Sequence, residues 1–535
     1  MSIFEQRIAA GSACAHSSRT NWLAIPVGEG DAFWPIAAIT AAALTIRLYL
    51  VFTAGCIAPD GVAYLAMARE FAAGEPARAL AWVFSPLYPW MIAVIHRLAP
   101  DWELTAEMIS VALGTATIPL LYYLMRESFG RRDIALCAAA LAAIHPDLAA
   151  YSASARTEAG YIFFVTAVLC LTAAAVKRRS VIGAAAAGIV CGLAYLFRTE
   201  AVGVPVVVAG LLVLEPMLGH AWPQRFGIIA AAAFSFAFLV VASPYLIYLR
   251  AYTGHWTVGR ELGVVVMEST GASVGDIESW RRLGYTTSTS GFTAIAISPR
   301  AYARKVVLSF GQSFYNFIQA LDPLLAAMMV VGLWLRRRGF LMRWHETMLA
   351  GVVAFYFIGF AFTATGARLL LHVVPFTLGW VAIGIEAVAR SLAGWRATRR
   401  IPAFAPILLI ALVLMPRTLW PLESDTRALR EAGLAIAARH TPNATVAARD
   451  PRVAFYADAN FVRLPTVAGT NICDWLARNG APNYLMIESR EEARWGGVAN
   501  AQCLGLIKRY PRRGKLHYDL FGAGLTSVTG FPAHH

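Results

Sequence analysis

Ionisable side chains recur at the ends of the most apolar segments of this sequence. Placing such groups at membrane depth is expensive, so they usually mark a functional site. The carboxylates in these positions are Asp60, Asp147, Glu158 and Glu200. We expect them to line one polar cavity at a single membrane surface.

Each carboxylate also has a simpler structural interpretation. Asp60 precedes a helical pattern that begins at Gly61, and aspartate is a favoured N-cap residue. Asp147 follows His145-Pro146 and could likewise cap a helix, whereas Glu158 would be stabilised by a helix dipole. Their common placement, more than any one of them, favours a shared site.

Three arginines lie at or inside the ends of apolar segments. Arg198 and Arg368 lie at the ends of apolar segments, and Arg47 lies inside the first one. Planar guanidinium groups suit phosphate or pyrophosphate better than a point charge does. The alternative is that these side chains extend to the interface, which is a weak explanation for Arg47 because of its depth.

The segments between these residues predict a polytopic membrane protein. Of the 535 residues, 58% are apolar and only 15% are charged, whereas soluble domains carry about 25% charged residues. A bilayer core requires about 20 apolar residues per helix. Eleven segments are candidates: 33–54, 104–125, 134–147, 158–176, 181–197, 201–215, 226–249, 320–335, 346–364, 368–390 and 402–420.

The positive charge of the chain indicates its orientation. The net charge is +14, but the basic residues fall in short loops and form no nucleic-acid-binding stripe. Four clusters each follow an even-numbered segment, so the positive-inside rule places those ends and the N-terminus in the cytoplasm. The clusters are Arg126, Arg131 and Arg132; Lys177, Arg178 and Arg179; Arg336, Arg337, Arg338 and Arg343; and Arg390, Arg396, Arg399 and Arg400.

This register divides the chain into three parts. Residues 1–31 form a cytoplasmic segment without signal-peptide features, and residues 32–422 form the membrane domain. Its stretches 55–103 and 250–319 face outside, the first with two surface helices and the second with a short helix from Pro299. Residues 423–535 form an extracytoplasmic domain, and we expect the protein in the cell inner membrane.

The C-terminal domain shows alternating helical and strand patterns. Helices are predicted at 426–440 and 472–478, and strands at 445–448, 460–464 and 484–488. This alternation is typical of a small α/β domain with a partly parallel sheet. Cys473 and Cys503 both fall in this domain, and the sequence leaves open whether they pair.

Several stretches resemble the GT-C class of membrane glycosyltransferases over about residues 40–420. The nearest in pattern are protein O-mannosyltransferases and lipid A aminoarabinose transferases. The resemblance rests on Pro59-Asp60 to Tyr64, Phe84-Ser-Pro-Leu-Tyr-Pro89, His145-Pro-Asp-Leu with Thr157-Glu158, Gly192-Leu-Ala-Tyr-Leu-Phe-Arg-Thr-Glu200, and Ala367-Arg368 with Pro375.

The resemblance implies an inverting transfer of a sugar from a polyprenyl-phosphate donor to a lipid, glycan or protein acceptor. Asp60 would be the general base, with Asp147, Glu158 and Glu200 as second carboxylates. Donor phosphate would bind Arg198, Arg368 and Arg47, and Tyr64 and Tyr88 would contact donor or acceptor. The family often has Asp-Glu where this chain has Asp60-Gly61, so no cofactor is certain, although a divalent cation would suit oxygen ligands.

The residues independently agree with a lipid-linked donor. Nucleotide sugars are absent outside the cytoplasm, and the cytoplasmic segments contain neither a glycine-rich phosphate loop nor a DxD motif. Two other interpretations stay open: a lipid or glycan transporter or flippase, and a non-catalytic membrane assembly protein. Transporters usually place charges near the bilayer midplane within repeats, whereas these charges gather at one surface.

Overall fold

The computed structural model describes residues 33–217, 222–260, 299–336, 344–363, 365–394, 405–464, 471–492, 495, 498, 501–512 and 516–523. The predicted segment 1–31 and residues 261–298 of the second outer stretch lie outside this set. So do six of the basic residues used for orientation: Arg337, Arg338, Arg343, Arg396, Arg399 and Arg400.

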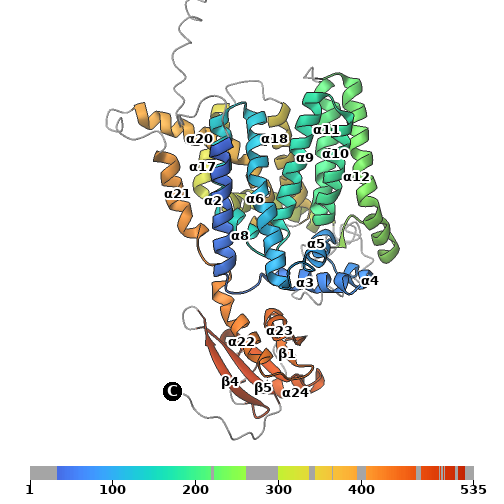
Figure 1. Cartoon of the computed structure of the whole chain (residues 1–535), viewed down its shortest axis with the longest axis vertical. Coiled ribbons are helices and arrows are strands. Elements are labelled where there is room, and N and C mark those ends of the chain that lie inside the picture. The colour runs from blue at the N-terminus through green and yellow to red at the C-terminus, as the bar shows by residue number, and fades with distance from the viewer. Residues whose placement is uncertain are drawn as a thin grey trace, which may run out of the picture.

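Long apolar helices form a bundle that makes up one part of the molecule. The C-terminal sheet domain lies next to one end of this bundle (Figure 1). The described bundle helices are α2 (Phe33–Thr53), α6 (Trp102–Phe129), α7 (Arg132–Ile144), α8 (Pro146–Ser152), α9 (Glu158–Arg178), α10 (Val181–Phe197), η2 (Thr199–Val202), α11 (Gly203–Met217), α12 (Gln224–Thr253), α16 (Pro299–Leu321), α17 (Pro323–Arg336), α18 (Trp344–Phe362), α19 (Ala367–Leu370), η3 (Leu371–Val373), α20 (Val374–Gly394) and α21 (Ala405–Thr418).

Each of the eleven predicted apolar segments coincides with helices of this bundle. Within the described residues, seven helices are long and apolar enough to cross a membrane, and nine if two bent pairs each count as one span. The bent pairs are α7 with α8 at 61° and α16 with α17 at 108°. By length and composition, the described residues thus contain fewer than the eleven predicted membrane spans. The difference arises because α10 and α21 are shorter than the roughly 20 residues that a span requires.

Glycines let some helices approach very closely. A Cβ atom on Gly332 of α17 would lie 1.9 Å from the Trp380 carbonyl oxygen of α20, and one on Gly384 would lie 1.8 Å from that of Met328. The two backbones therefore contact each other directly. Small residues at helix contacts are the usual means of packing in lipid, where no hydrophobic force acts between helices.

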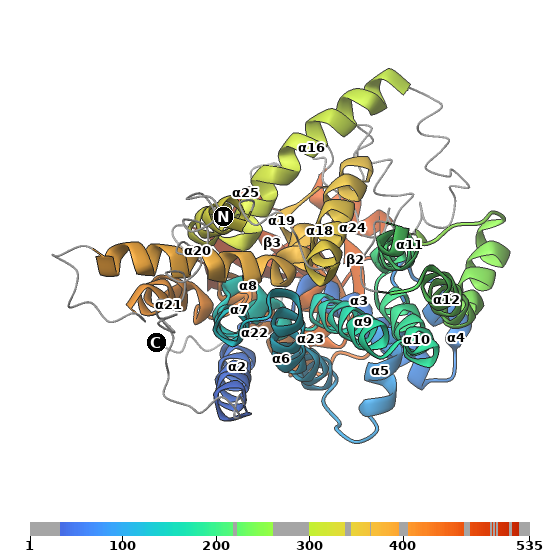
Figure 2. The same cartoon turned by 90° about the horizontal axis from the view of Figure 1, so that it is seen from above.

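Short helices cover the end of the bundle that faces the sheet domain. They are α3 (Pro59–Ala72), α4 (Pro76–Leu80) and α5 (Leu87–Ile95). The two predicted surface helices are thus present, with α3 beginning two residues earlier than expected. The predicted short helix from Pro299 is instead the 23-residue α16, which Figure 2 shows lengthwise at the edge of the bundle.

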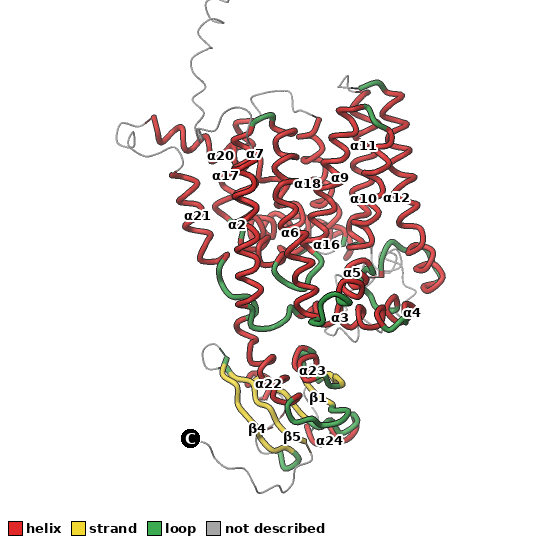
Figure 3. Tube along the Cα trace, in the orientation of Figure 1, coloured by secondary structure: helices red, strands yellow, loops and turns green. Residues whose placement is uncertain are grey.

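The C-terminal domain is a five-stranded mixed sheet with helices on it (Figure 3). The strand order is β2-β1-β3-β5-β4, in which β1 pairs in parallel with β2 and β3, while β5 is antiparallel to β3 and β4. Its elements are η4 (Ser424–Thr426), α22 (Arg427–Ala437), β1 (Thr445–Ala448), α23 (Arg452–Ala457), β2 (Asn460–Arg463), α24 (Ile472–Arg478), β3 (Tyr484–Glu488), α25 (Ser489–Glu492), β4 (Leu504–Pro511) and β5 (His517–Ala523).

The two faces of the sheet have separate cores. On one face, α22 and α23 pack through Leu429 and Val453 in a cluster that also includes Tyr64 of α3 and Tyr88 of α5. On the other face, α24 packs on Leu485. The first cluster therefore joins the sheet domain to the surface helices of the bundle.

Cys473 and Cys503 form a disulfide, which settles the pairing that the sequence left open. We expect reductant to slow the electrophoretic mobility of the alkylated wild-type chain, and Cys473→Ser to abolish that difference. Because the bond closes a loop with a sequence separation of 30, its loss should lower domain stability by about 3.5–4 kcal/mol. Cys56→Ser, at a buried free cysteine, should leave the mobility difference unchanged.

Candidate active site

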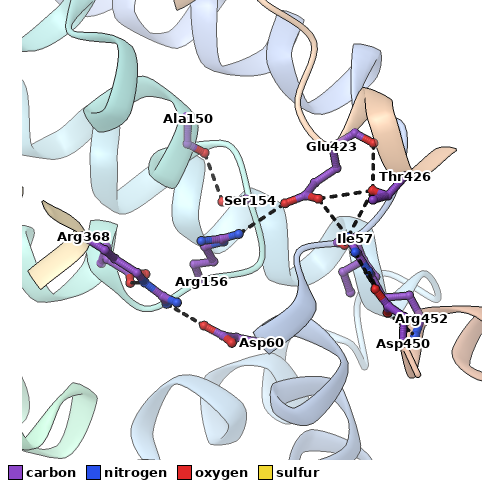
Figure 4. A network of polar contacts seen from close by, with 11 residues as sticks. Ile57, Asp60, Ala150, Ser154, Arg156, Arg368, Glu423, Thr426, Asp450 and Arg452 are labelled. Atoms are coloured by element: carbon purple, nitrogen blue, oxygen red, sulfur yellow. Dashed lines mark hydrogen bonds and ion pairs between the residues drawn. The ribbon is translucent and has the colours of Figure 1, made fainter. Parts of the chain in front are cut away.

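Carboxylates and arginines alternate at the end of the bundle that faces the C-terminal sheet. The Asp60 carboxylate lies 2.6 Å from Nη2 of Arg368, whose Nε donates to Glu158. Glu158 lies 3.2 Å from Nη1 of Arg198, and Nη2 of Arg198 lies 2.6 Å from Glu200. Figure 4 shows the Asp60–Arg368 pair. We call these five residues the charge cluster.

Helix ends and breaks position the members of the charge cluster. Asp60 lies in the first turn of α3, but the N-cap residue is Ala58, which makes no side-chain cap. Glu158 is the first residue of α9, and Arg198 lies in extended conformation between α10 and η2. Arg368 follows Gly366 in the short helix α19. Asp60 is therefore free to pair with Arg368 instead of capping its own helix.

The charge cluster is buried in its middle and most accessible at its Asp60–Arg368 end. Glu158 is fully buried, the side chains of Arg198 and Glu200 are 11% and 19% exposed, and those of Asp60 and Arg368 are 25% and 35% exposed. A buried carboxylate requires charged partners to remain ionised at an acceptable cost. The inner residues therefore fix the geometry, and the outer pair is the part that a ligand can reach.

Tyr64 adjoins the charge cluster and Tyr88 does not. The Tyr64 hydroxyl lies 3.3 Å from Oγ1 of Thr157, which also accepts from Arg198 at 2.9 Å. Tyr88 is fully buried, and its hydroxyl donates to the Ala106 carbonyl at 2.9 Å. Tyr88 therefore packs inside the core, with its ring buried and its hydroxyl hydrogen-bonded to the protein. In this arrangement its side chain does not reach a ligand at the charge cluster.

Asp147 and Arg47 lie apart from the charge cluster. Asp147 is in the first turn of α8, where His145 provides the cap, and its charged neighbours are Arg417 and Asp322. Arg47 is buried and donates to the carbonyls of Ala43 and Ala143. The structure therefore does not bring these two predicted site residues to Asp60.

A second polar network joins the membrane domain to the C-terminal domain (Figure 4). Arg156 lies 3.3 Å from Glu423, which lies 2.8 Å from Arg452, which in turn contacts Asp450 at 2.6 Å. The guanidinium carbons of Arg156 and Arg368 lie 4.9 and 5.8 Å from the Tyr151 ring centroid. We call Arg156, Glu423, Arg452 and Asp450 the interdomain relay.

Local sequence patterns did not single out Glu423 and Arg452. A signal exists for Arg452, which follows the predicted strand 445–448 by four residues, because segments that leave parallel strands meet at the carboxyl edge of the sheet. No comparable signal marks Glu423, because its place depends on how the two domains dock.

The charge cluster does not suit a cation, because arginines already contact its carboxylates. Among the described residues, Glu492, His517 and Asp519 place ligand atoms within 4.8 Å of one another and could hold a divalent cation. Burial raises the pKa of Glu492. Despite burial, the pairing with Arg509 lowers the pKa of Asp519. A cation there would compete with Arg509, which lies 2.7 Å from Asp519.

Comparisons with known proteins agree with this architecture. No curated protein matches the sequence, but the family described as dolichyl-phosphate-mannose-protein mannosyltransferase matches residues 83–248. That range includes Glu158, Arg198 and Glu200 and excludes Asp60 and Arg368.

Three solved structures are similar. ArnT from Cupriavidus metallidurans bound to undecaprenyl phosphate has 15% identity and a TM-score of 0.57, covering 94% of this chain and 100% of that one. AglB, the Archaeoglobus fulgidus oligosaccharyltransferase, in complex with an inhibitory peptide and a dolichol-phosphate, has 14% identity and a TM-score of 0.54, covering 91% and 74%. The same enzyme with Zn and sulfate has 14% identity and a TM-score of 0.54, covering 90% and 72%. The resemblance to the GT-C class and the polytopic helical fold are thereby confirmed.

We expect loss of the Glu158 charge to destabilise the bundle. Glu158→Gln would leave two arginines with less compensation in a buried site, and breaking a buried pair costs about 3–5 kcal/mol. The thermal unfolding midpoint of the detergent-solubilised protein should fall clearly. Glu431→Gln breaks the exposed pair with Arg427 and should change stability by less than about 1 kcal/mol. Equal midpoints for the two variants would contradict the structural role of Glu158.

Proposed function

We propose that this membrane protein transfers a sugar from a polyprenyl-phosphate donor to an acceptor hydroxyl outside the cytoplasm. The family match and the GT-C fold support glycosyl transfer. The single observation that carries the proposal is the contact of Asp60 with Arg368 at the most accessible end of the charge cluster. There a base and a phosphate-binding group lie side by side.

In the proposed reaction, the acceptor oxygen attacks the anomeric carbon of the donor sugar. The bond from that carbon to the phosphate oxygen breaks, and its electron pair leaves with the polyprenyl phosphate. Asp60 takes the acceptor proton, which makes the oxygen a better nucleophile as the new bond forms. Attack opposite the leaving group inverts the configuration at the anomeric carbon.

Arg368 is the proposed ligand for the departing phosphate. It is the more exposed of the two arginines in the charge cluster, and guanidinium groups bind phosphate oxygens through paired hydrogen bonds. Phosphate bound at Arg368 would weaken its contact with Asp60 and leave that carboxylate free to accept a proton. Arg198, held between Glu158 and Glu200, would position Arg368 through Glu158.

We also propose that the C-terminal domain lies outside the inner membrane. Lys177 and Arg178 end α9, whereas Glu158 begins it. The basic end of this helix is therefore opposite the charge cluster. Basic loops stay in the cytoplasm, which supports an outside location for Asp60 and the sheet.

Asp60→Asn tests the proposed base. We expect transfer from a polyprenyl-phosphate sugar to fall by about 10²–10⁴-fold, the usual contribution of general base catalysis, with unchanged expression and thermal stability. Asp458→Asn is a matched control, since Asp458 is 89% exposed and its left-handed backbone conformation suits asparagine. Full activity of Asp60→Asn would exclude Asp60 as the base.

Single cysteines test the proposed orientation in a Cys14→Ser background. Arg478→Cys, at an exposed site of α24, should react with a membrane-impermeant maleimide in spheroplasts, whose inner membrane is intact. Lys177→Cys, at a side chain that is 63% exposed, should react only after the inner membrane is permeabilised. The reverse pattern would place Asp60 on the cytoplasmic side and contradict the proposed function.

A further inference from the structure

A crevice of about 310 Å³ lies between the start of α3 and the C-terminal sheet. Its wall on the membrane side includes Pro59, the residue before Asp60. Its other wall includes residues at the carboxyl ends of the three parallel strands, together with Leu429 of α22, Glu491 of α25 and Tyr518 of β5. The charged residues that line it are Arg449, Asp450, Arg463, Glu488 and Glu491.

Sheet topology explains why a crevice forms there. Strand β1 lies between β2 and β3, and all three are parallel. The chain leaves the carboxyl end of β1 toward β2, whereas β3 lies on the other side of β1. Ligands of open α/β sheets bind at such a switch in strand order, outside the carboxyl ends of the strands.

The charges of the crevice are arranged in pairs. Glu491 lies 2.5 Å from Arg449, Asp450 lies 2.6 Å from Arg452, and Glu488 lies 2.7 Å from Arg512. Paired carboxylates still have lone pairs that accept hydrogen bonds, and paired guanidinium groups still have donors. A surface of fixed donors and acceptors suits hydroxyl groups better than it suits a free ion.

The crevice is close to balanced in formal charge. Its lining holds two arginines, Arg449 and Arg463, and three carboxylates, Asp450, Glu488 and Glu491. Arg452 and Arg512, which are not part of the lining, pair with Asp450 and Glu488. Met486 and Tyr518 provide an apolar part of the lining. This combination favours a neutral ligand with several hydroxyls and an apolar ring face, and the volume lies at the lower end of about 300–1,000 Å³ for ligand sites.

The interdomain relay connects the crevice to the segment that precedes Asp60 of the charge cluster. Asp450 lines the crevice and pairs with Arg452, which also donates to the Ile57 carbonyl at 3.3 Å, three residues before Asp60. Glu423 then connects Arg452 to Arg156 on the membrane side. A ligand in the crevice is thus held against the segment that carries Asp60.

We propose that this crevice binds a neutral carbohydrate unit, the part of the acceptor that receives the sugar. Its role as an acceptor site rests on the proposed glycosyl transfer, whereas its ability to bind carbohydrate does not. Most of the crevice lining belongs to the C-terminal domain, so the crevice would receive a water-exposed ligand, while the lipid-linked donor would approach through the bundle.

Binding can be measured on the full-length chain in lipid nanodiscs by saturation-transfer NMR. The probes are neutral disaccharides (mannobiose, maltose, lactose and chitobiose) at millimolar concentration, with inorganic phosphate and a neutral tetrapeptide as alternatives. We expect at least one disaccharide to bind. Arg463→Leu and Glu491→Gln should each weaken it at least about tenfold, because each removes a hydrogen bond to a charged group and a tenfold change corresponds to only about 1.4 kcal/mol. Arg478→Leu, on α24 outside the crevice, should leave binding unchanged.

Several outcomes would overturn the site. They are the absence of disaccharide binding, binding of phosphate or peptide alone, and disaccharide binding that persists in both crevice variants. Sugar transfer by the wild-type chain separates this proposal from the proposed function. Disaccharide binding that is lost in the crevice variants, by a wild-type chain that transfers no sugar from a polyprenyl-phosphate donor, would support the site and refute the function. Transfer by a protein whose crevice variants bind normally would refute the site alone.

Discussion

A carboxylate without solvent access, Glu158, is the constraint on which the sheet-facing end of the bundle depends. Its ionised form is stable only because Arg198 and Arg368 approach it from two other helical segments. Both arginines sit where regular helix is interrupted, one between α10 and η2 and the other in the short helix α19. The local departures from helix are therefore part of the site, because they bring distant segments to one buried charge.

The same electrostatic requirement links the two domains. Arg452 is only 6% exposed and contacts both Asp450 and Glu423, so its charge is compensated from the sheet domain and from the segment after α21. Tyr456 strengthens this joint: its hydroxyl accepts from the Ile57 amide at 2.7 Å and donates to Glu103 at 2.8 Å. Together with the shared hydrophobic cluster, these contacts fix the segment before Asp60 from both sides.

Much of this architecture could be predicted from local patterns. Apolar segments located the bundle helices, and alternation located β1, β2 and β3, because both signals are contained within a few residues. The charged residues at segment ends gave Asp60, Glu158, Glu200, Arg198 and Arg368, which the structure brings together.

Which of the predicted residues lie together depends on tertiary contacts. Asp147 has the same local signature as Glu158, yet the bend between α7 and α8 turns it toward Arg417 and Asp322. Tyr88 lies in the expected loop, but its direction is set by core packing against Tyr64 and Phe197. A residue type at the right depth predicts a charged site, whereas helix bends and helix packing decide which of these residues meet.

Arg368 bridges two carboxylates because the helical segments α3, α9 and α19 meet at one place. One guanidinium touches both the buried Glu158 and the accessible Asp60, so any anion that engages Arg368 must change the environment of Asp60. In the proposed reaction, a single side chain would therefore link donor binding to the readiness of the base.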